Sequence, residues 1–501
     1  MKPDSQIFVQ SLQQLIPSPE ATACLTEAAA RRLQLVPLAR NRVEQRDSLL
    51  VACADPSDQA VLERLERQVP VGINPVLIAA DAAEIPGAID KCYSSTATLD
   101  ELLELCRQPA TAMQLLQNQP DAIVRLLEYL LLAARRQRAS DMHLSPEGRH
   151  LHVRFRVDGV LRHFSTLSKS VHNGLLVRIK ILSSVDIAET RRPQDGQFSQ
   201  FMDGSVIDFR VSCFPTVNGQ NTVIRLLDSH CRYDSLQRLN LPQDLYQALA
   251  GLAHRPEGLL VICGPTGSGK SNTLHALINE RDAESLNIMT LEDPVEIAMA
   301  GIRQSSIDAE HAMDFAQGVR GLLRQDPDVL LIGEVRDIPS CAMALRAVMS
   351  GHQLLTTVHA SSAMAGLARL KELGALAGQL AENLMAIASQ RLVRRFCQEC
   401  EGRRDRCQAC QGSGYQGRQL IMELLLITPP LAALIAKDEP AQVLLECART
   451  QGFRTLREQG EGLVRQGLTS RKEIERVLGR EDRPGSRSTG QGELSNAIEH
   501  S

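Results

Sequence analysis

One stretch near the middle of this 501-residue chain constrains the fold more than any other. Residues 258–263 form an apolar run, and a glycine-rich segment that ends in Lys270 and Ser271 follows directly. The pattern GxxxxGK[ST] after a predicted strand predicts a loop whose backbone N–H groups surround phosphates, followed by a helix that points its N-terminus at the anion. Leu274 and Leu277 lie on the apolar stripe expected of that helix. The sequence therefore predicts a nucleoside triphosphate site.

The loop supplies the predicted ligands of this nucleotide. Lys270 is expected to place a positive charge at the β and γ phosphates, and the hydroxyl of Ser271 to bind Mg²⁺. The glycines let the backbone curl around the phosphates. The predicted nucleotide-binding residues are Gly264, Pro265, Thr266, Gly267, Ser268, Gly269, Lys270 and Ser271.

Two acidic clusters follow predicted strands further along the chain. Glu334 comes shortly after the apolar residues 329–332, and Glu292 belongs to an acidic cluster at residues 290–296. Strands of this type place a carboxylate beside the phosphate loop, where it holds Mg²⁺ or aligns the attacking water. Glu334 is the predicted general base, and Glu292 is the next candidate.

The pattern of strands and helices divides the chain into several parts. Short apolar strands alternate with helices from residue 258, which predicts a parallel sheet. Other strands are expected at residues 49–53, 150–157, 205–212 and 221–227, and helices at residues 58–66, 101–117, 121–137 and, predominantly, 421–478. The predicted segments are an N-terminal domain (1–95), a linker (96–118), a second α/β domain (119–232), a P-loop core (233–395), a cysteine motif (396–418), a helical part (419–479) and a disordered tail (480–501).

Composition narrows the class of protein. With 43% hydrophobic and 23% charged residues the chain is typical of soluble globular proteins, and no apolar run is long enough to span a membrane. The N-terminal residues lack the apolar core of a signal peptide, so we expect a cytoplasmic protein. A net charge of −4, an aromatic content of 3% and the absence of Trp argue against direct binding of nucleic acid.

Four of the thirteen cysteines form a pattern: Cys397, Cys400, Cys407 and Cys410 make two CxxC pairs six residues apart. Disulfides are disfavoured in a reducing compartment, and a thioredoxin-type site has one CxxC after a strand rather than two in tandem. An iron–sulfur cluster is an alternative with different usual spacings. Four thiolates in a closed tetrahedral shell suit a structural Zn²⁺ best, with Gly402 helping the short loop to turn.

The chain resembles a known family, the ATPases of type II secretion and type IV pilus assembly. The resemblance rests on four sequence motifs, called boxes, that occur in the same order as in that family. Residues 264–271 are similar to its Walker A loop, residues 290–296 to its Asp box, residues 323–337 to its Walker B and residues 351–359 to its His box. Further similar stretches precede the P-loop, at residues 139–143, 154–161, 192–196, 209–212 and 219–227. The segment after the cysteines resembles that of the assembly ATPases.

The resemblance implies a fold and a set of catalytic residues. The fold is α/β: a RecA-type P-loop ATPase domain preceded by a PAS-like α/β domain and a small N-terminal α/β domain, with a zinc knuckle and a helical C-terminal part. His359 would sense the nucleotide. The arginines at family positions, expected to stabilise charge in phosphoryl transfer, are Arg210, Arg225, Arg320, Arg324 and Arg336.

The sequence departs from the family at three places. Family members often carry Arg at Gln197, Glu at Gln220 and a Thr-Asn pair at Ala360 and Ser361. Loss of charge at the first two positions bears on nucleotide affinity or on coupling between domains.

The resemblance also implies partners. It predicts a homo-hexameric, cytoplasmic ATPase that uses ATP, Mg²⁺ and Zn²⁺, peripheral on the bacterial inner membrane. The N-terminal domain would be its adaptor to the membrane complex. Its partners would be an inner-membrane platform protein and the cytoplasmic domain of a membrane assembly component. Two alternatives remain: a DNA-translocating or conjugation-type motor, and a regulatory homologue that binds nucleotide without turnover. The sequence does not distinguish a pilus from a secretion pseudopilus.

Overall fold

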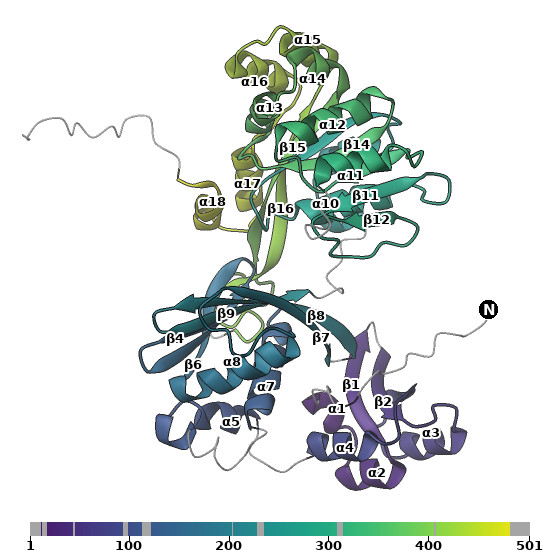
Figure 1. Cartoon of the computed structure of the whole chain (residues 1–501), viewed down its shortest axis with the longest axis vertical. Coiled ribbons are helices and arrows are strands. Elements are labelled where there is room, and N and C mark those ends of the chain that lie inside the picture. Colours follow the sequence, from purple (N-terminus) through teal and green to yellow (C-terminus); the bar gives the residue numbers. More distant parts are fainter. Residues whose placement is uncertain are drawn as a thin grey trace, which may run out of the picture. The chain divides into compact units, whose positions relative to one another are not determined.

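The computed structural model describes residues 12, 18–43, 46–93, 99–112, 122–202, 204–227, 235–307, 314–404 and 407–480. The chain forms two compact units, Met1–Cys231 and Arg232–Ser501 (Figure 1). The tail predicted to be disordered lies outside the described residues from residue 481 on. No helix among those described combines the length and the apolar character that crossing a membrane requires.

The first unit begins with a three-stranded sheet of order β1-β2-β3, in which β2 runs antiparallel to β1 and parallel to β3. Leu49 and Val51 of β2 are fully buried in a core that includes Ile89 of α4. Asp58 caps α3 because its carboxylate accepts hydrogen bonds from the first free amides of the helix. The elements are α1 (Pro19–Thr22), α2 (Glu27–Leu33), β1 (Val36–Val43), β2 (Arg46–Cys53), α3 (Gln59–Glu66), β3 (Ile73–Ala79) and α4 (Ile85–Tyr93).

The same unit continues with a six-stranded antiparallel sheet of order β6-β5-β4-β9-β8-β7. The strands alternate between buried and exposed positions, and α7 and α8 cover one face (Figure 1). Leu102 and Leu103 of α5, from the predicted linker, are buried in this core. The elements are α5 (Leu99–Leu105), α7 (Ala122–Arg136), β4 (Ala139–Glu147), β5 (His150–Val157), β6 (Val160–Ser168), η1 (Lys169–Val171), α8 (His172–Leu182), β7 (Gln194–Met202), β8 (Ser205–Thr216) and β9 (Gly219–Leu227).

The second unit is built on a seven-stranded sheet of order β12-β11-β13-β14-β10-β15-β16. All neighbouring pairs are parallel except β15 and β16. Every residue of β10, β11, β13 and β14 is buried, as expected when helices cover both faces of a parallel sheet. The elements up to β14 are η2 (Leu236–Leu239), α9 (Gln243–Ala253), β10 (Gly258–Cys263), α10 (Lys270–Asn279), β11 (Ile288–Glu292), β12 (Arg303–Ser306), α11 (Phe315–Leu322), β13 (Val329–Ile332), α12 (Ile338–Met349) and β14 (Gln353–Val358).

A long antiparallel hairpin and the C-terminal helices complete this unit. The prediction of helix from residue 421 is wrong for residues 421–426, which belong to β16. This run, Ile-Met-Glu-Leu-Leu-Leu, is apolar on both faces, so its periodicity does not distinguish a buried strand from a helix. The remaining elements are α13 (Ala363–Glu372), α14 (Ala377–Asn383), β15 (Leu384–Phe396), β16 (Tyr415–Leu426), α15 (Pro429–Ala436), α16 (Ala441–Thr450), α17 (Leu456–Arg465) and α18 (Arg471–Leu478).

Candidate functional site

The glycine-rich loop connects β10 to α10 at the carboxyl edge of the parallel sheet. Gly264 has φ +152°, and a Cβ there would lie 2.5 Å from Ser268 Oγ and 2.9 Å from the Gln390 carbonyl oxygen. Only glycine therefore fits at the start of the loop. Thr266, Gly267 and Ser271 are exposed, so the loop is open to a ligand at the N-terminus of α10.

Lys270 folds back over the loop in this structure. Its Nζ donates hydrogen bonds to the carbonyl oxygens of Gly264 at 2.8 Å and Pro265 at 3.3 Å. Burial lowers the pKa of Lys270, and the negative charge of Glu334 opposes that shift. The ammonium of Lys270 therefore already lies at the loop, where it is bound to carbonyl oxygens. Phosphate oxygens would replace these carbonyls as acceptors, since a charged acceptor makes a stronger hydrogen bond than a carbonyl does.

Glu334 lies at the centre of an ion-pair cluster two residues beyond β13. Its carboxylate is 3.0 Å from His359 Nε2 and 2.7 Å from Arg336 Nε, and its side chain is 13% exposed. Arg336 Nη1 also lies 3.5 Å from Asp293 Oδ2. The fold thus brings together residues that follow three strands, β11, β13 and β14. One oxygen of Glu334 faces Arg336 and the other faces His359, so both oxygens are engaged in this structure.

Glu292, the other predicted acid, has a different environment at the end of β11. Its buried carboxylate accepts hydrogen bonds from Thr290 Oγ1 at 2.7 Å and Gln304 Nε2 at 3.1 Å, and lies 3.2 Å from His275 Nε2. Burial raises the pKa of Glu292. The hydrogen bonds, that of His275 foremost, lower this pKa by more than burial raises it, so the net shift is downward. Glu292 is therefore held as a carboxylate that ties β11 to α10, the helix that carries His275.

The predicted arginines are distributed over both units. Arg320 lies exposed on α11, and the exposed Arg324 donates to the Arg320 carbonyl oxygen at 3.1 Å. Among the described contacts neither arginine binds Glu334 or the phosphate loop. Arg210 and Arg225 face each other across β8 and β9 of the first unit, and Arg225 Nε is 3.0 Å from Asp141 Oδ1.

The departures from the family lie in both units as well. Gln197 pairs with Arg210 in the register of β7 and β8. Gln220 is buried, and its side-chain amide makes no described hydrogen bond. Ser361 is exposed between His359 and α13, and its carbonyl oxygen accepts a hydrogen bond from Arg391 Nη2 at 2.8 Å.

The four patterned cysteines converge in the loop between β15 and β16. Their Sγ atoms all lie within 4.8 Å of one another. The pair Cys397 and Cys407 is 3.9 Å apart and the pair Cys400 and Cys410 is 3.7 Å apart. A tetrahedron with Zn–S bonds of about 2.3 Å has S–S edges of about 3.8 Å, so this donor set fits Zn²⁺.

The backbone around these thiols suits a metal ligand set. Gly414 N–H points at Cys410 Sγ, 3.3 Å away. Burial raises the pKa of Cys410. That N–H and the neighbouring thiols have the larger, opposite effect, and the resulting pKa is about 7. Gly402 has φ +81°, and a Cβ there would lie 2.6 Å from the Phe396 ring, so the turn requires glycine.

Two family models match the chain. The model described as "Type II/IV secretion system protein" matches residues 117–476, and the MshEN domain model matches residues 6–99. The chain belongs to the type II/IV secretion system protein family. The resemblance inferred from the four boxes is therefore confirmed.

Members of this family resemble the chain over most of its length. The type II secretion system protein HxcR of Pseudomonas aeruginosa is 38% identical over 403 residues, which are 79% of this chain and 84% of HxcR. The type IV pilus assembly ATPase PilB of the same species is 31% identical over 489 residues, which are 90% of this chain and 85% of PilB. The sequence predicted a secretion or pilus-assembly ATPase, and these relatives belong to that class.

Solved structures support the fold. The pilus retraction motor PilT with bound ADP is 27% identical, with a TM-score of 0.52 over 70% of this chain and 96% of PilT. The ATPase DotB of Legionella pneumophila is 21% identical, with a TM-score of 0.54 over 70% of this chain and 94% of DotB. The predicted α/β fold class of a secretion-family P-loop protein is confirmed.

Several polar residues around the site were not predicted from the sequence. His275 was missed although it interrupts the apolar stripe of α10, which is a signal in the sequence. Gln390, Arg391 and Glu423 had no such signal, because their contacts are with residues 30 to 122 positions away.

Proposed function

We propose that this chain is a motor that hydrolyses ATP to drive assembly of a type IV pilus or a type II secretion pseudopilus. The observation that carries the proposal is the placement of the phosphate loop, Glu334 and His359 at one edge of one sheet, in a chain of this family. Residues 264–271 would surround the phosphates of ATP. Mg²⁺, held by Ser271, would neutralise charge between the β and γ phosphates.

The ion pairs of Glu334 suggest how binding would prepare catalysis. The γ phosphate carries more negative charge than a carboxylate. It would therefore attract the guanidinium of Arg336 and the imidazole of His359 away from Glu334. That exchange would free the carboxylate of Glu334 to orient the attacking water as the general base. Lys270 would leave the Gly264 carbonyl for the β and γ phosphates. Substrate binding would thus assemble the catalytic arrangement.

The remaining predicted arginines and ions have separate roles in this proposal. Arg210, Arg225, Arg320 and Arg324 would stabilise the charge that develops in the transition state. Glu292 would position α10 through His275. Cys397, Cys400, Cys407 and Cys410 would hold Zn²⁺ in a closed shell, which has no position open for a reactant and is therefore structural.

The proposed assembly is a homo-hexamer, cytoplasmic and peripheral on the inner membrane. Its partners would be a platform protein and the cytoplasmic domain of a membrane assembly component, engaged through the N-terminal domain. ATP turnover would be transmitted to them as closure and reopening of the nucleotide site.

ATPase assays on the purified chain test this proposal, with Lys270→Ala as the inactive control. We expect turnover that rises with the cytoplasmic domain of the membrane component and does not respond to DNA. Stimulation by DNA would favour a nucleic-acid motor. Nucleotide binding without turnover under all these conditions would favour a regulatory homologue.

A further inference from the structure

The hairpin of β15 and β16 contacts two parts of the nucleotide site. Gln390 Nε2 donates to the Ser268 carbonyl oxygen of the phosphate loop at 2.9 Å. The next residue, Arg391, donates through Nη2 to the Ser361 carbonyl oxygen at 2.8 Å, two residues after His359. One strand therefore holds both the loop that would bind phosphate and the segment that follows its sensor.

The partner strand carries a buried carboxylate that joins two helices. Glu423 Oε1 accepts a hydrogen bond from Ala363 N at 2.6 Å, and Oε2 accepts one from Leu456 N at 2.9 Å. Ala363 and Leu456 are the first residues of α13 and α17, where helix amides lack intrahelical partners and the dipole favours negative charge. Glu423 is 4% exposed, so both bonds are shielded from water.

Neither bond duplicates the ordinary cap of its helix. Ser362 already caps α13 by accepting from Ala365 N, and Thr455 caps α17 by accepting from Glu458 N. Those caps act within one helix. The two oxygens of Glu423 instead tie α13, which follows the His359 segment, to α17, 93 residues further along the chain.

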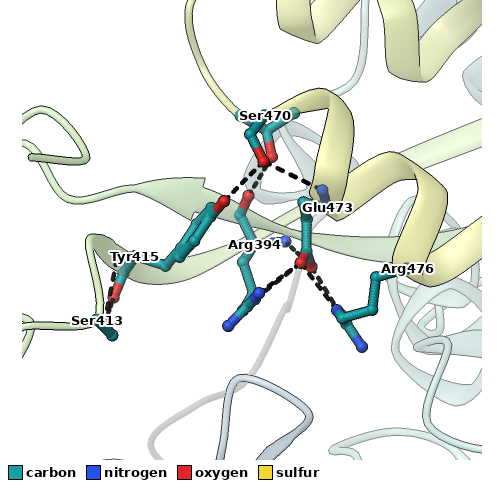
Figure 2. Close-up of polar contacts among 7 residues, drawn as sticks. Arg394, Ser413, Tyr415, Ser470, Glu473 and Arg476 are labelled. Atoms are coloured by element: carbon teal, nitrogen blue, oxygen red, sulfur yellow. Dashed lines mark hydrogen bonds and ion pairs between the residues drawn. The ribbon is translucent and has the colours of Figure 1, made fainter. Parts of the chain in front are cut away.

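The connection continues from α17 towards the cysteine loop. Gly460 of α17 packs against Ile474 of α18, since a Cβ on Gly460 would lie 2.8 Å from that side chain. Glu473 of α18 binds Arg394, three residues before Cys397 (Figure 2). Contacts between neighbouring groups thus run from His359 to the cysteine cluster.

We propose that Glu423, assisted by Arg391, is a positioning residue that couples the nucleotide state at His359 to α17, α18 and the cysteine loop. The inference rests on the proposed ATP site. When His359 exchanges Glu334 for a γ phosphate, the segment of residues 360–362 shifts with it. Because Ala363 N and Leu456 N share one carboxylate, the N-terminus of α17 must follow that shift or lose a hydrogen bond.

Amide hydrogen exchange on the full-length chain, followed by mass spectrometry, tests this coupling. Exchange is measured with and without Mg²⁺ and a non-hydrolysable ATP analogue. In the wild type we expect the analogue to change exchange at the first turn of α17. In Glu423→Gln, basal exchange there rises about five-fold, because the amide oxygen replaces only one of two acceptors. The variant still binds the analogue, and the response of α17 to it is lost.

Glu458→Gln is the matched control, because Glu458 caps α17 by accepting from Thr455 N at 2.8 Å and makes no described contact with α13. We expect faster exchange of α17 with the nucleotide response retained. Arg391→Lys is a second variant that tests the same connection without changing Glu423, and we expect it to weaken the response.

Each outcome decides the inference. A wild type that binds the analogue without any change at α17 overturns the coupling and leaves the proposed function intact. A full response in Glu423→Gln does the same. If that variant does not fold, a full response in Arg391→Lys overturns the coupling and a weakened one supports it. A wild type that does not bind the analogue contradicts the proposed function, and the coupling fails with it.

Discussion

Replacing Glu473 by Gln should release α18 from the base of the cysteine loop. The Glu473 carboxylate lies 2.6 Å from Arg394 Nη2 and 2.6 Å from Arg476 Nη2, and it also accepts from Arg394 N at 3.0 Å (Figure 2). The Glu473 side chain is 0% exposed. Gln keeps the shape of the side chain but removes the charge and directs an NH₂ group at guanidinium donors.

The pKa of Glu473 gives the size of this effect. Burial alone raises that pKa, but the hydrogen bonds from Arg476 and Arg394 lower it more, from 4.5 to about 2. At about 1.4 kcal/mol per pKa unit the ionised carboxylate contributes roughly 3 kcal/mol at neutral pH. A depressed pKa means that this contribution is complete above about pH 4.5 and disappears as the pH falls towards 2.

Hydrogen exchange of the α18 amides measures the predicted loss. At pH 7 we expect Glu473→Gln to open α18 roughly a hundred-fold more often than the wild type. Between pH 4.5 and 2, after correction for intrinsic exchange, the wild type should approach the variant. Glu475→Gln is the control, since Glu475 lies on the same helix and forms none of the described ion pairs. Equal protection in the two variants at pH 7 would refute the reasoning.

Three further predictions concern the proposed nucleotide and metal sites. Glu334→Gln should bind ATP and turn it over at least about a hundred-fold more slowly, because the base is lost; wild-type turnover would make Glu292 the candidate. Metal analysis should give about one Zn per chain, and Cys397→Ser with Cys400→Ser should lose it while nucleotide binding persists; iron, or free thiols without metal, would contradict the zinc site. Arg225→Ala should lower turnover by roughly a thousand-fold with Mg-ADP binding intact, and wild-type activity per chain should rise with protein concentration; full activity of the variant with a flat profile would exclude a ring mechanism.

Local patterns in the sequence were sufficient where one segment determines its own structure. Residues 150–157 were predicted as a strand and form β5, because their alternation matches a half-buried sheet. The helix predicted at residues 121–137 is observed as α7, whose apolar residues recur at helical spacing. The cysteine spacing indicated a cluster, and the four thiols do converge.

Local sequence patterns did not predict the contacts between segments that are distant in the sequence. Glu423 lies in an apolar run, and nothing local indicates that its carboxylate meets two helix N-termini. The strand β16 was also missed, because it forms by pairing with a separate segment, β15. A buried charge of this kind is intelligible only when its partners are known, since without them its burial would be unfavourable.

The departure from the family at Ala360 and Ser361 is understandable in these terms. The segment after His359 is held through its backbone: the Ser361 carbonyl oxygen accepts from Arg391, and Ala363 N donates to Glu423. Neither bond uses the side chain of Ala360 or Ser361, so a change of residue type there leaves the attachment to the hairpin in place. The part of the segment that does depend on a side chain is His359, which is retained and faces Glu334. Variation at these two positions is therefore compatible with transmission from the nucleotide site, whereas variation at Glu423 is not.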